Sequence, residues 1–455
     1  MYTKNLNKRI FKFINIRFDE VKKDTSDLLP DYLNCEIQLN PFALQSYSVE
    51  IEGTNSSGDI GVAGTFGYEH KNLFRGAEIL DINIRGAVEA MKKRYNNQFD
   101  NTVEFGSEVR IRFPKFILPF FSELFVKRYN PKTQVAVSYN YQQRPDYTRT
   151  IVNGSFGYTW KGSRNISHMI NPIELNFVKL PNTPQLEEFL DRIKNYPYIV
   201  NSYKDHLIAV TNYSFIFNNQ DIQKNTNFMF FRWNFESAGN ILSAVYDISG
   251  QQKIDDAYQL FGTRYAQYLL SDIDIRYYQN VNKTDKIAYR LFVGCGYPYN
   301  NSLALPFEKK YFSGGANSIR AWQVRTLGPG SFTDTLSSYP NSLGDVKLEF
   351  NLEYRFDIFW VLEGALFLDA GNIWAIRDVE ERENTIFRFD RFYEDIAIGT
   401  GFGTRFDFSF FVFRLDMGLK TRDPALSSSN KWIIGNQKLS WQDHFNLVLA
   451  IGYPF

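Results

Sequence analysis

The chain has 455 residues and a formal net charge of +1, so it lacks the chain-wide basic field that would favour nucleic-acid binding. Aromatic residues make up 17% of it, and no run of about 18 apolar residues occurs, which excludes a transmembrane helix. Membrane-spanning β-strands remain compatible with this composition. Their residues alternate between lipid and water, so the mean hydropathy stays low, here −0.34.

Residues 1–44 differ in pattern from the rest of the chain. The start, MYTKNLNKRIFKFINIRFDE, is basic but lacks the apolar stretch of about 7–15 residues that a secretory signal needs. Either the protein is cytosolic, or Met1 is not the start of the full product. The stretches FKFINIRFDEV and YLNCEIQLNPF predict two strands of a small soluble unit, which we interpret as the end of a domain.

Alternation of apolar and polar residues dominates from about Gln45 to the C-terminus. In GDVKLEFNLEYRFDIFW, the expected strand has one apolar face and one polar face. The apolar face carries Leu348, Phe350, Leu352, Tyr354 and Phe356, and the polar face carries Lys347, Glu349, Asn351, Glu353 and Arg355. The same pattern predicts strands near 45–54, 60–71, 76–90, 101–113, 132–142, 149–160, 166–178, 206–218, 226–237, 268–280, 286–297, 345–357, 361–374, 395–407, 409–420 and 443–455.

Sixteen strands, many of them longer than the about 5–6 residues usual in soluble folds, favour an outer-membrane barrel over a soluble β-sandwich. Long connections alternate with short turns, as they do between the outer and periplasmic ends of such barrels. The long ones are 178–205, 238–267, 298–344, 375–394 and 421–442. We therefore predict an all-β fold, a sixteen-stranded antiparallel transmembrane β-barrel over residues 45–455. Within the first long connection, TPQLEEFLDRIKNYP predicts a short surface helix between Pro184 and Pro197.

Candidate catalytic and metal-binding residues do not form a pattern. The four histidines, His70, His168, His206 and His444, lack metal-ligand spacing, and no Ser-His pairing suggests a hydrolase. GTGFGTRF leads into another strand rather than a helix, so its glycines do not predict a nucleotide site. They instead leave room on the inner face for something to pack there. We expect no cofactor, no metal and no enzymatic activity.

The loop FSGGANSIRAWQVRTLGPGS, residues 312–331, is unusual because it holds an isoleucine, an arginine and a tryptophan among glycines. Ile319 and Trp322 are costly to leave in water. Arg320 is a planar and permanently charged fork that suits carboxylates. Glu353 and Asp369 lie on the polar faces of the two strands that follow the loop. A loop folded back into the lumen would let Arg320 reach either carboxylate.

On these residues the chain resembles the BamA/TamA superfamily of outer-membrane assembly and translocation barrels. In that family the sixth extracellular loop carries an Arg-Gly-Phe/Tyr motif, folds into a sixteen-stranded barrel and contacts acidic residues on strands twelve and thirteen. The resemblance implies a loop-anchor motif of Ile319, Arg320, Ala321 and Trp322, with Glu353, Asp369 and Gly371 as its lumen partners. Ala321 stands where the family has glycine and Trp322 where it has Phe or Tyr, so the aromatic packing is expected to persist while residue 321 has less backbone freedom than glycine.

The resemblance extends over about 45–455 and is strongest at 311–374 and at the C-terminus. It implies a C-terminal signal strand marked by Phe445, Tyr453 and Phe455. By the same resemblance, residues 1–44 look like the C-terminal remnant of a periplasmic POTRA domain, with further POTRA units and a signal peptide upstream.

The function that the resemblance implies is insertion or translocation of client polypeptides through a laterally gated barrel in the outer membrane of a Gram-negative-type envelope. The expected partners are unfolded outer-membrane or secreted client proteins and the lipid bilayer, with accessory envelope proteins possible and no nucleic acid. The seam would lie between the first strand, where Ser46, Ser48, Glu50 and Glu52 share one face, and the last. The alternatives are a secretion-type or patatin-linked relative of the same superfamily, and a passive porin.

Overall fold

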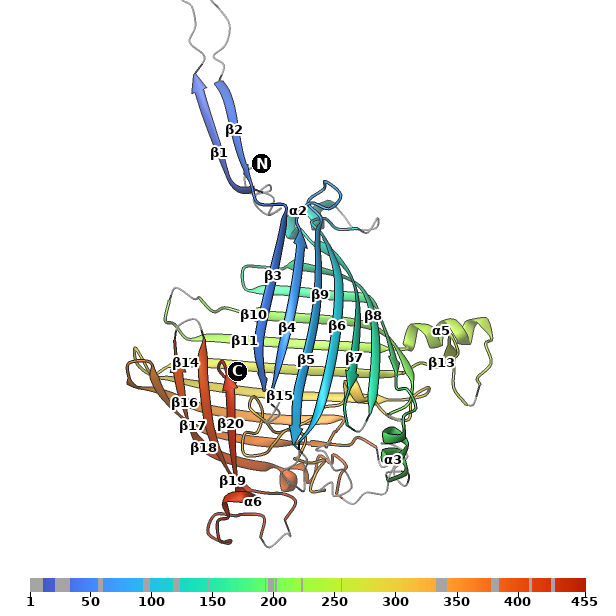
Figure 1. Cartoon of the computed structure of the whole chain (residues 1–455), viewed down its shortest axis with the longest axis vertical. Coiled ribbons are helices and arrows are strands. Elements are labelled where there is room, and N and C mark those ends of the chain that lie inside the picture. The colour runs from blue at the N-terminus through green and yellow to red at the C-terminus, as the bar shows by residue number, and fades with distance from the viewer. Residues whose placement is uncertain are drawn as a thin grey trace, which may run out of the picture.

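Two antiparallel sheets dominate the computed structural model of the chain (Figure 1). The structure describes residues 11–20, 33–55, 60–92, 99–117, 123–145, 147–192, 194, 200, 203–221, 224–254, 256–332, 342–377, 384–408, 411–426 and 430–455. The smaller sheet pairs β1 (Phe11–Glu20) with β2 (Leu33–Pro41), which confirms the two strands predicted near the start. This hairpin projects from the end of the large sheet at which the first barrel strand begins. Its assignment to a POTRA domain stays a prediction.

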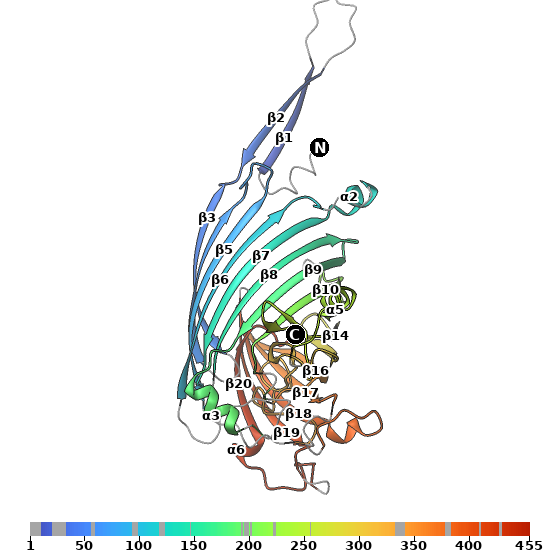
Figure 2. The same cartoon turned by 90° about the vertical axis from the view of Figure 1, so that its right-hand side faces the viewer.

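The large sheet has the sixteen antiparallel strands that the alternation predicts. In hydrogen-bonded order they are β3 (Gln45–Asn55), β4 (Ile60–His70), β5 (Ile79–Lys92), β6 (Phe99–Phe113), β7 (Lys132–Gln143), β8 (Thr148–Lys161), β9 (Ile166–Lys179), β10 (His206–Asn218), β11 (Phe228–Ala238), β14 (Tyr268–Asn280), β15 (Lys286–Pro298), β16 (Val346–Phe359), β17 (Leu362–Trp374), β18 (Ala397–Asp407), β19 (Val412–Arg422) and β20 (Phe445–Ile451). Each strand pairs with its neighbours in sequence, so the sheet is a continuous meander that curves around an interior lumen (Figures 1 and 2).

The burial of the two faces is the reverse of that in a soluble sandwich. On β16, Glu349 and Glu353 are fully buried, whereas Phe350 on the opposite face is 38% exposed. Charged side chains therefore point into the lumen and apolar side chains point outward, as in a barrel whose outer surface contacts lipid. Among the residues that the structure describes, no helix has the length and hydropathy needed to cross a membrane.

Short elements occupy several connections. They are α2 (Glu123–Tyr129), α3 (Pro184–Arg192), α5 (Asn240–Ser249), the hairpin of β12 (Gln259–Leu260) and β13 (Thr263–Arg264), the 3-10 helices η1 (Phe307–Lys309) and η2 (Phe392–Asp395), and α6 (Trp441–His444). The predicted surface helix is confirmed as α3, and its Leu186 packs in a buried cluster with Tyr147, Tyr203 and Phe307. The predicted boundary at Pro197 lies outside the described residues.

The two edge strands of the sheet, β3 and β20, are not paired with each other. They differ in length, because β3 has 11 residues and β20 has 7. The predicted last strand, 443–455, is therefore too long at both ends. Asp443 belongs to α6, and Gly452, with a φ of 82°, turns the chain away from the sheet just after Ile451.

Candidate functional site

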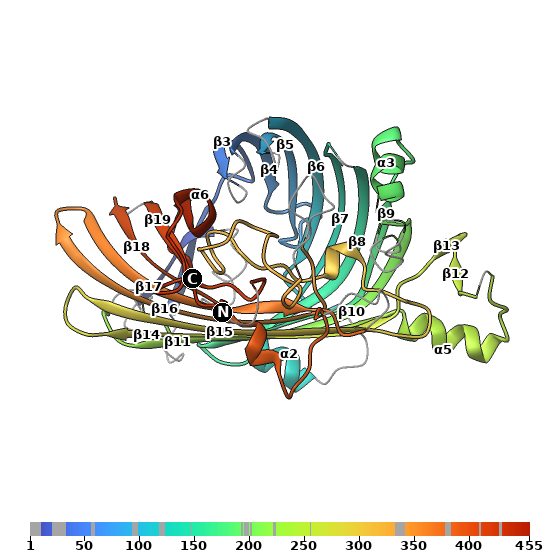
Figure 3. The same cartoon turned by 90° about the horizontal axis from the view of Figure 1, so that it is seen from below.

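The sixth outer connection, between β15 and β16, folds back onto the inner face of the sheet (Figure 3). Ile319, Ala321, Trp322 and Leu327 form a buried cluster with Ala397 of β18. Ile319 is fully buried and Trp322 is 3% exposed, so both apolar side chains are sheltered from water. The inward fold of this loop, expected from the sequence, is confirmed.

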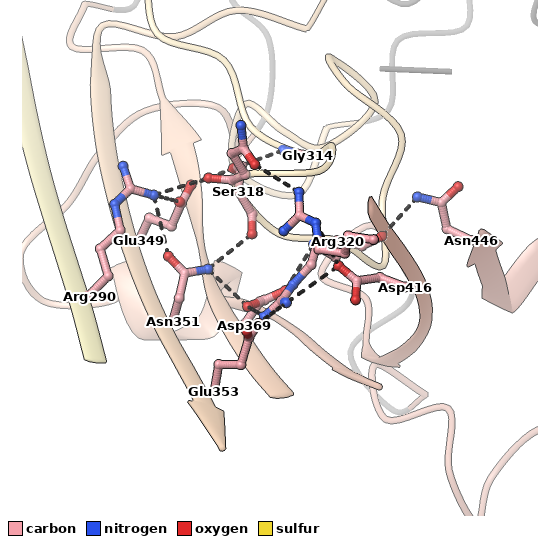
Figure 4. A network of polar contacts seen from close by, with 12 residues as sticks. Arg290, Gly314, Ser318, Arg320, Glu349, Asn351, Glu353, Asp369, Asp416 and Asn446 are labelled. Carbon is pink, nitrogen blue, oxygen red and sulfur yellow. Dashed lines mark hydrogen bonds and ion pairs between the residues drawn. The ribbon is translucent and has the colours of Figure 1, made fainter. Parts of the chain in front are cut away.

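Arg320 contacts both of the carboxylates that the sequence nominated (Figure 4). Its Nε and Nη2 each donate to Asp369 of β17 at 2.9 Å, and its backbone N–H donates to the same carboxylate at 3.0 Å. Its Nη1 donates to Glu353 of β16. The guanidinium lies 3.6 Å from the centre of the Phe367 ring. The bidentate geometry fixes the orientation of the arginine as well as its position.

Further charges on β18 and β19 complete the cluster around the arginine. Asp416 of β19 lies 3.6 Å from Arg320 and also accepts a hydrogen bond from Arg405 of β18, which in turn donates to Glu353 at 3.2 Å. Arg414 lies 3.5 Å from Asp416. All of these side chains are fully buried. Arg355 of β16 also lies 2.7 Å from Glu353, so four arginines surround the three carboxylates of Glu353, Asp369 and Asp416.

A second set of contacts holds the residues just before Arg320. Ser318 donates to Glu349, whose carboxylate also accepts from Arg290 of β15 at 2.7 Å. Asn351 links the two sets, because its Nδ2 donates to the Ser318 carbonyl at 3.0 Å and to Asp369 at 2.9 Å. These partners were not nominated from the sequence. The sequence could have indicated Glu349 and Asn351, because they share the polar face of β16 with Glu353.

Two glycines of the wall make room for Ala321. A Cβ on Gly418 of β19 would lie 2.8 Å from the Cα and N of Ala321, and one on Gly399 of β18 would lie 2.6 Å from its Cβ. Ala321 itself is not among the described residues with positive φ. Alanine therefore fits where the family pattern has glycine, because the close approach is accommodated by the wall rather than by the loop.

The glycines at alternate positions of β18 all serve this region. Besides Gly399, a Cβ on Gly401 would lie 2.3 Å from the Phe367 ring, on which Arg320 rests, and one on Gly403 would lie 1.9 Å from the Asp416 carboxylate. The expectation that these glycines leave space inside the barrel is confirmed.

Gly371 is placed differently from the other predicted lumen partners. It pairs with Glu349 across the ladder, and a Cβ at this position would lie 2.1 Å from the Leu348 carbonyl oxygen. Its φ of 151° also favours glycine. Gly371 therefore allows β17 to approach β16 closely, and the described contacts of Arg320 do not include it.

The loop has a second attachment to the wall through η1. Glu308 accepts a hydrogen bond from Arg149 of β8 at 3.0 Å, and its other carboxylate oxygen lies 3.1 Å from Nε2 of His206 at the start of β10. Burial raises the pKa of the Glu308 carboxyl, but the hydrogen bond from His206 and the charges of His206 and Arg149 outweigh this effect and leave the pKa lowered. The loop is thus fixed to the wall at two separate points.

The last strand contacts the loop directly. Asn446 of β20 donates from Nδ2 to the carbonyl oxygen of Arg320 at 2.8 Å. Phe445 is the first residue of β20, two positions after the predicted start, and Tyr453 and Phe455 lie beyond the end of the strand. The Tyr453 hydroxyl lies 2.9 Å from the carboxylate of Glu363, and Phe455 is 9% exposed. These two aromatic residues therefore lie outside β20, although the sequence predicted a strand that runs to residue 455.

Arginine–carboxylate pairs, amides and aromatic rings can position a loop. Across the part of the chain that the structure describes, no group of three or more His, Cys, Asp or Glu side chains could hold a metal ion.

Comparisons with known proteins agree with this architecture. A family model described as the Omp85 superfamily domain matches residues 81–436. BamA from Haemophilus ducreyi lacking POTRA domains 1–3 superposes with a TM-score of 0.61 at 11% identity, covering 99% of this chain and 77% of that one. CdiB from Escherichia coli gives a TM-score of 0.50 at 10% identity, with 98% and 69% covered. A search of curated proteins finds no match. Since the family model spans most of the sequence, the chain belongs to the Omp85 superfamily.

Proposed function

We infer that the chain forms an outer-membrane pore that passes client polypeptides into or across the membrane through the seam between β3 and β20. Membership of the Omp85 superfamily supports a role in the assembly or secretion of outer-membrane and secreted proteins. The same membership supports placement in the outer membrane of a Gram-negative-type envelope. The proposal assigns no catalytic step to the chain.

The observation that carries the proposal is the unequal length of the two edge strands. β20 offers only 7 residues to the 11 of β3, so even a closed seam would leave part of the β3 edge without a backbone partner. Unpaired backbone groups are costly in lipid, at several kcal/mol each as an order of magnitude. A client strand that pairs with this edge would satisfy those groups by strand addition.

The anchored loop complements the seam. Arg320 contacts β16, β17 and β19, and Asn446 of β20 contacts the loop as well. The last strand is therefore positioned by the loop from inside the barrel rather than by its edge partner alone. Such an arrangement can keep β20 in place while its outer edge is free to exchange partners.

Tethering the seam tests this mechanism. In a Cys35→Ser/Cys295→Ser background, cysteines on β3 at Tyr47 or Val49 would be combined with cysteines on β20 at Leu447 or Leu449, because all four side chains face outward. The pairs that oxidise would be kept. Reconstituted barrels would then be assayed for client insertion and for client export. A tethered seam is expected to slow client passage, and reductant is expected to restore it.

A tether inside the wall is the matched control. Val62 on β4 and Val88 on β5 are ladder partners that both face outward, with exposures of 61% and 51%. A Val62→Cys/Val88→Cys disulfide should leave client passage unchanged. Normal client passage through a fully oxidised seam would refute lateral passage. A steady conductance that no seam or loop variant alters, without any client effect, would favour the passive porin.

A further inference from the structure

The connection between β11 and β14 carries an apolar surface that the protein itself does not cover. On α5, Ile241, Val245 and Ile248 follow one another at helical spacing and are 65%, 52% and 88% exposed. Spacings of four and three residues place all three on one face of the helix. This face is turned away from the rest of the protein, although an amphipathic surface helix usually turns its apolar face inward.

The opposite side of α5 is attached to the hairpin β12–β13 by polar and aromatic contacts. The Ser243 hydroxyl lies 2.9 Å from the Tyr265 hydroxyl, and Tyr246 donates from its hydroxyl to the carbonyl of Gln259 at 3.1 Å. Asp247, the one charged residue of α5, accepts a hydrogen bond from the Tyr258 hydroxyl at 2.7 Å. These contacts fix the rotation of the helix, so the outward direction of the apolar face is built into the fold.

The hairpin continues the same apolar surface onto the barrel wall. Phe261 at its tip is 81% exposed, and its ring centre lies 6.3 Å from that of Phe177 on β9. Phe177 shares its face of the strand with Ile173 and Leu175, which are 56% and 38% exposed. This is the outward face of the sheet. α5 and the hairpin lie outside the curved wall, next to β9 and β10 (Figure 3).

We propose that α5 and the tip of the β12–β13 hairpin insert into the outer leaflet of the membrane at its interface with water. We infer that lipid covers this apolar surface, because the surface is continuous with the lipid-facing side of β9. Its chemistry is that of an interfacial segment, with aliphatic side chains and a phenylalanine at the depth of the acyl-chain boundary. α5 contains no basic residue, so burial of apolar area drives the insertion, and attraction to anionic headgroups does not.

This inference deepens the proposed function, because it rests on placement of the barrel in the outer membrane. α5 and the hairpin tip, inserted in the outer leaflet, would hold the wall strands β9–β11 at a fixed depth. β3 and β20 are the two edges of the sheet, whereas β9–β11 lie near its middle. The inserted segment therefore lies on the part of the wall that is away from the seam.

Depth measurement on labelled protein tests the proposal. In the Cys35→Ser/Cys295→Ser background, a nitroxide would be attached at Ile248→Cys, and at Glu188→Cys as the control. Glu188 is an exposed residue of α3, the helix in another outer connection. Each protein would be placed in phosphatidylcholine nanodiscs at one barrel per disc, and the collision of the label with oxygen and with a water-soluble nickel chelate would be compared.

The expected result is a several-fold higher ratio of oxygen to nickel collisions at residue 248 than at residue 188, because oxygen concentrates in lipid and the chelate does not. A label at Phe261→Cys should behave as the one at 248. Equal ratios at 248 and 188 would overturn the proposal. Protection of 248 from both reagents, or spin–spin coupling between barrels when two share a disc, would also overturn it in favour of protein contact. Since no client is needed, this result is independent of the seam experiment.

Discussion

Replacing Arg320 by methionine would leave two carboxylates in the wall without their main cation. Glu353 would keep Arg355 and Arg405 as partners, at 2.7 and 3.2 Å. Asp369 would lose three hydrogen bonds from the arginine and keep the one from Asn351. Removing one partner of a buried ion pair costs about 3–5 kcal/mol. The equilibrium between docked and undocked loop should therefore shift by a factor of at least about 100.

Trypsin cleavage in the loop measures this shift. Arg325 lies within the loop and is joined to it by backbone hydrogen bonds to Ser313 and Ser342. Reconstituted wild-type protein should resist cleavage at Arg325, and the Arg320→Met protein should be cut there much faster. The matched variant is Arg320→Met/Asp369→Leu, which removes the stranded carboxylate together with the cation.

The double variant should recover part of the protection, because apolar residues of similar volume often replace a buried ion pair at little cost. Unchanged protection in Arg320→Met would refute the anchoring role of the arginine. Equal cleavage of the single and double variants would show that desolvation of Asp369 is not the source of the effect.

Three further outcomes are expected. Gly418→Val should push Ala321 away from the wall at a cost of about 1–3 kcal/mol, which should be seen as faster cleavage of the loop. Cleavage of this variant at the wild-type rate would contradict the close packing of Ala321 against Gly418. Asn446→Ala should cost about 1 kcal/mol and speed amide exchange in β20 without affecting β4, and equal exchange in β20 would contradict the link. The contact of Glu308 with His206 should stabilise the docked loop near neutral pH. It should be lost as the pH falls through the lowered pKa of Glu308, so that cleavage of the loop becomes faster in acid. In a Glu308→Gln protein, the rate of loop cleavage should not show this dependence on pH.

The alternation of residue types was sufficient to predict the strands because it depends only on neighbours in sequence. β17 was expected at 361–374 and is found at Leu362–Trp374. The end of β20 was not predicted because the alternation continues through Tyr453 and Phe455. There the positive φ of Gly452 interrupts the ladder, and only the short Gly-Tyr-Pro stretch signalled a turn.

The sequence predicted which side chains of the site share a face of a strand. It did not predict how far along the barrel axis each of them lies. Alternation placed Glu349, Asn351 and Glu353 on one side of β16, and the resemblance singled out Glu353. Which of them meets Ser318 and which meets Arg320 depends on how deep the loop descends, and this is set by contacts among distant segments. Glu308 and His206 are 102 positions apart, so no pattern among neighbouring residues indicated their pairing.

The bond from Asn446 to the carbonyl of Arg320 joins residues 126 positions apart, and one of them lies in the last strand of the chain. Closing so long a segment is entropically slow, and it can occur only after β16 to β19 have formed the wall against which the loop docks. We therefore expect the hydrogen bond of the Asn446 amide to form only after the loop has docked. A barrel whose loop is still undocked presents its final strand without this contact, and the final strand of such a barrel would remain the most exchangeable part of the molecule.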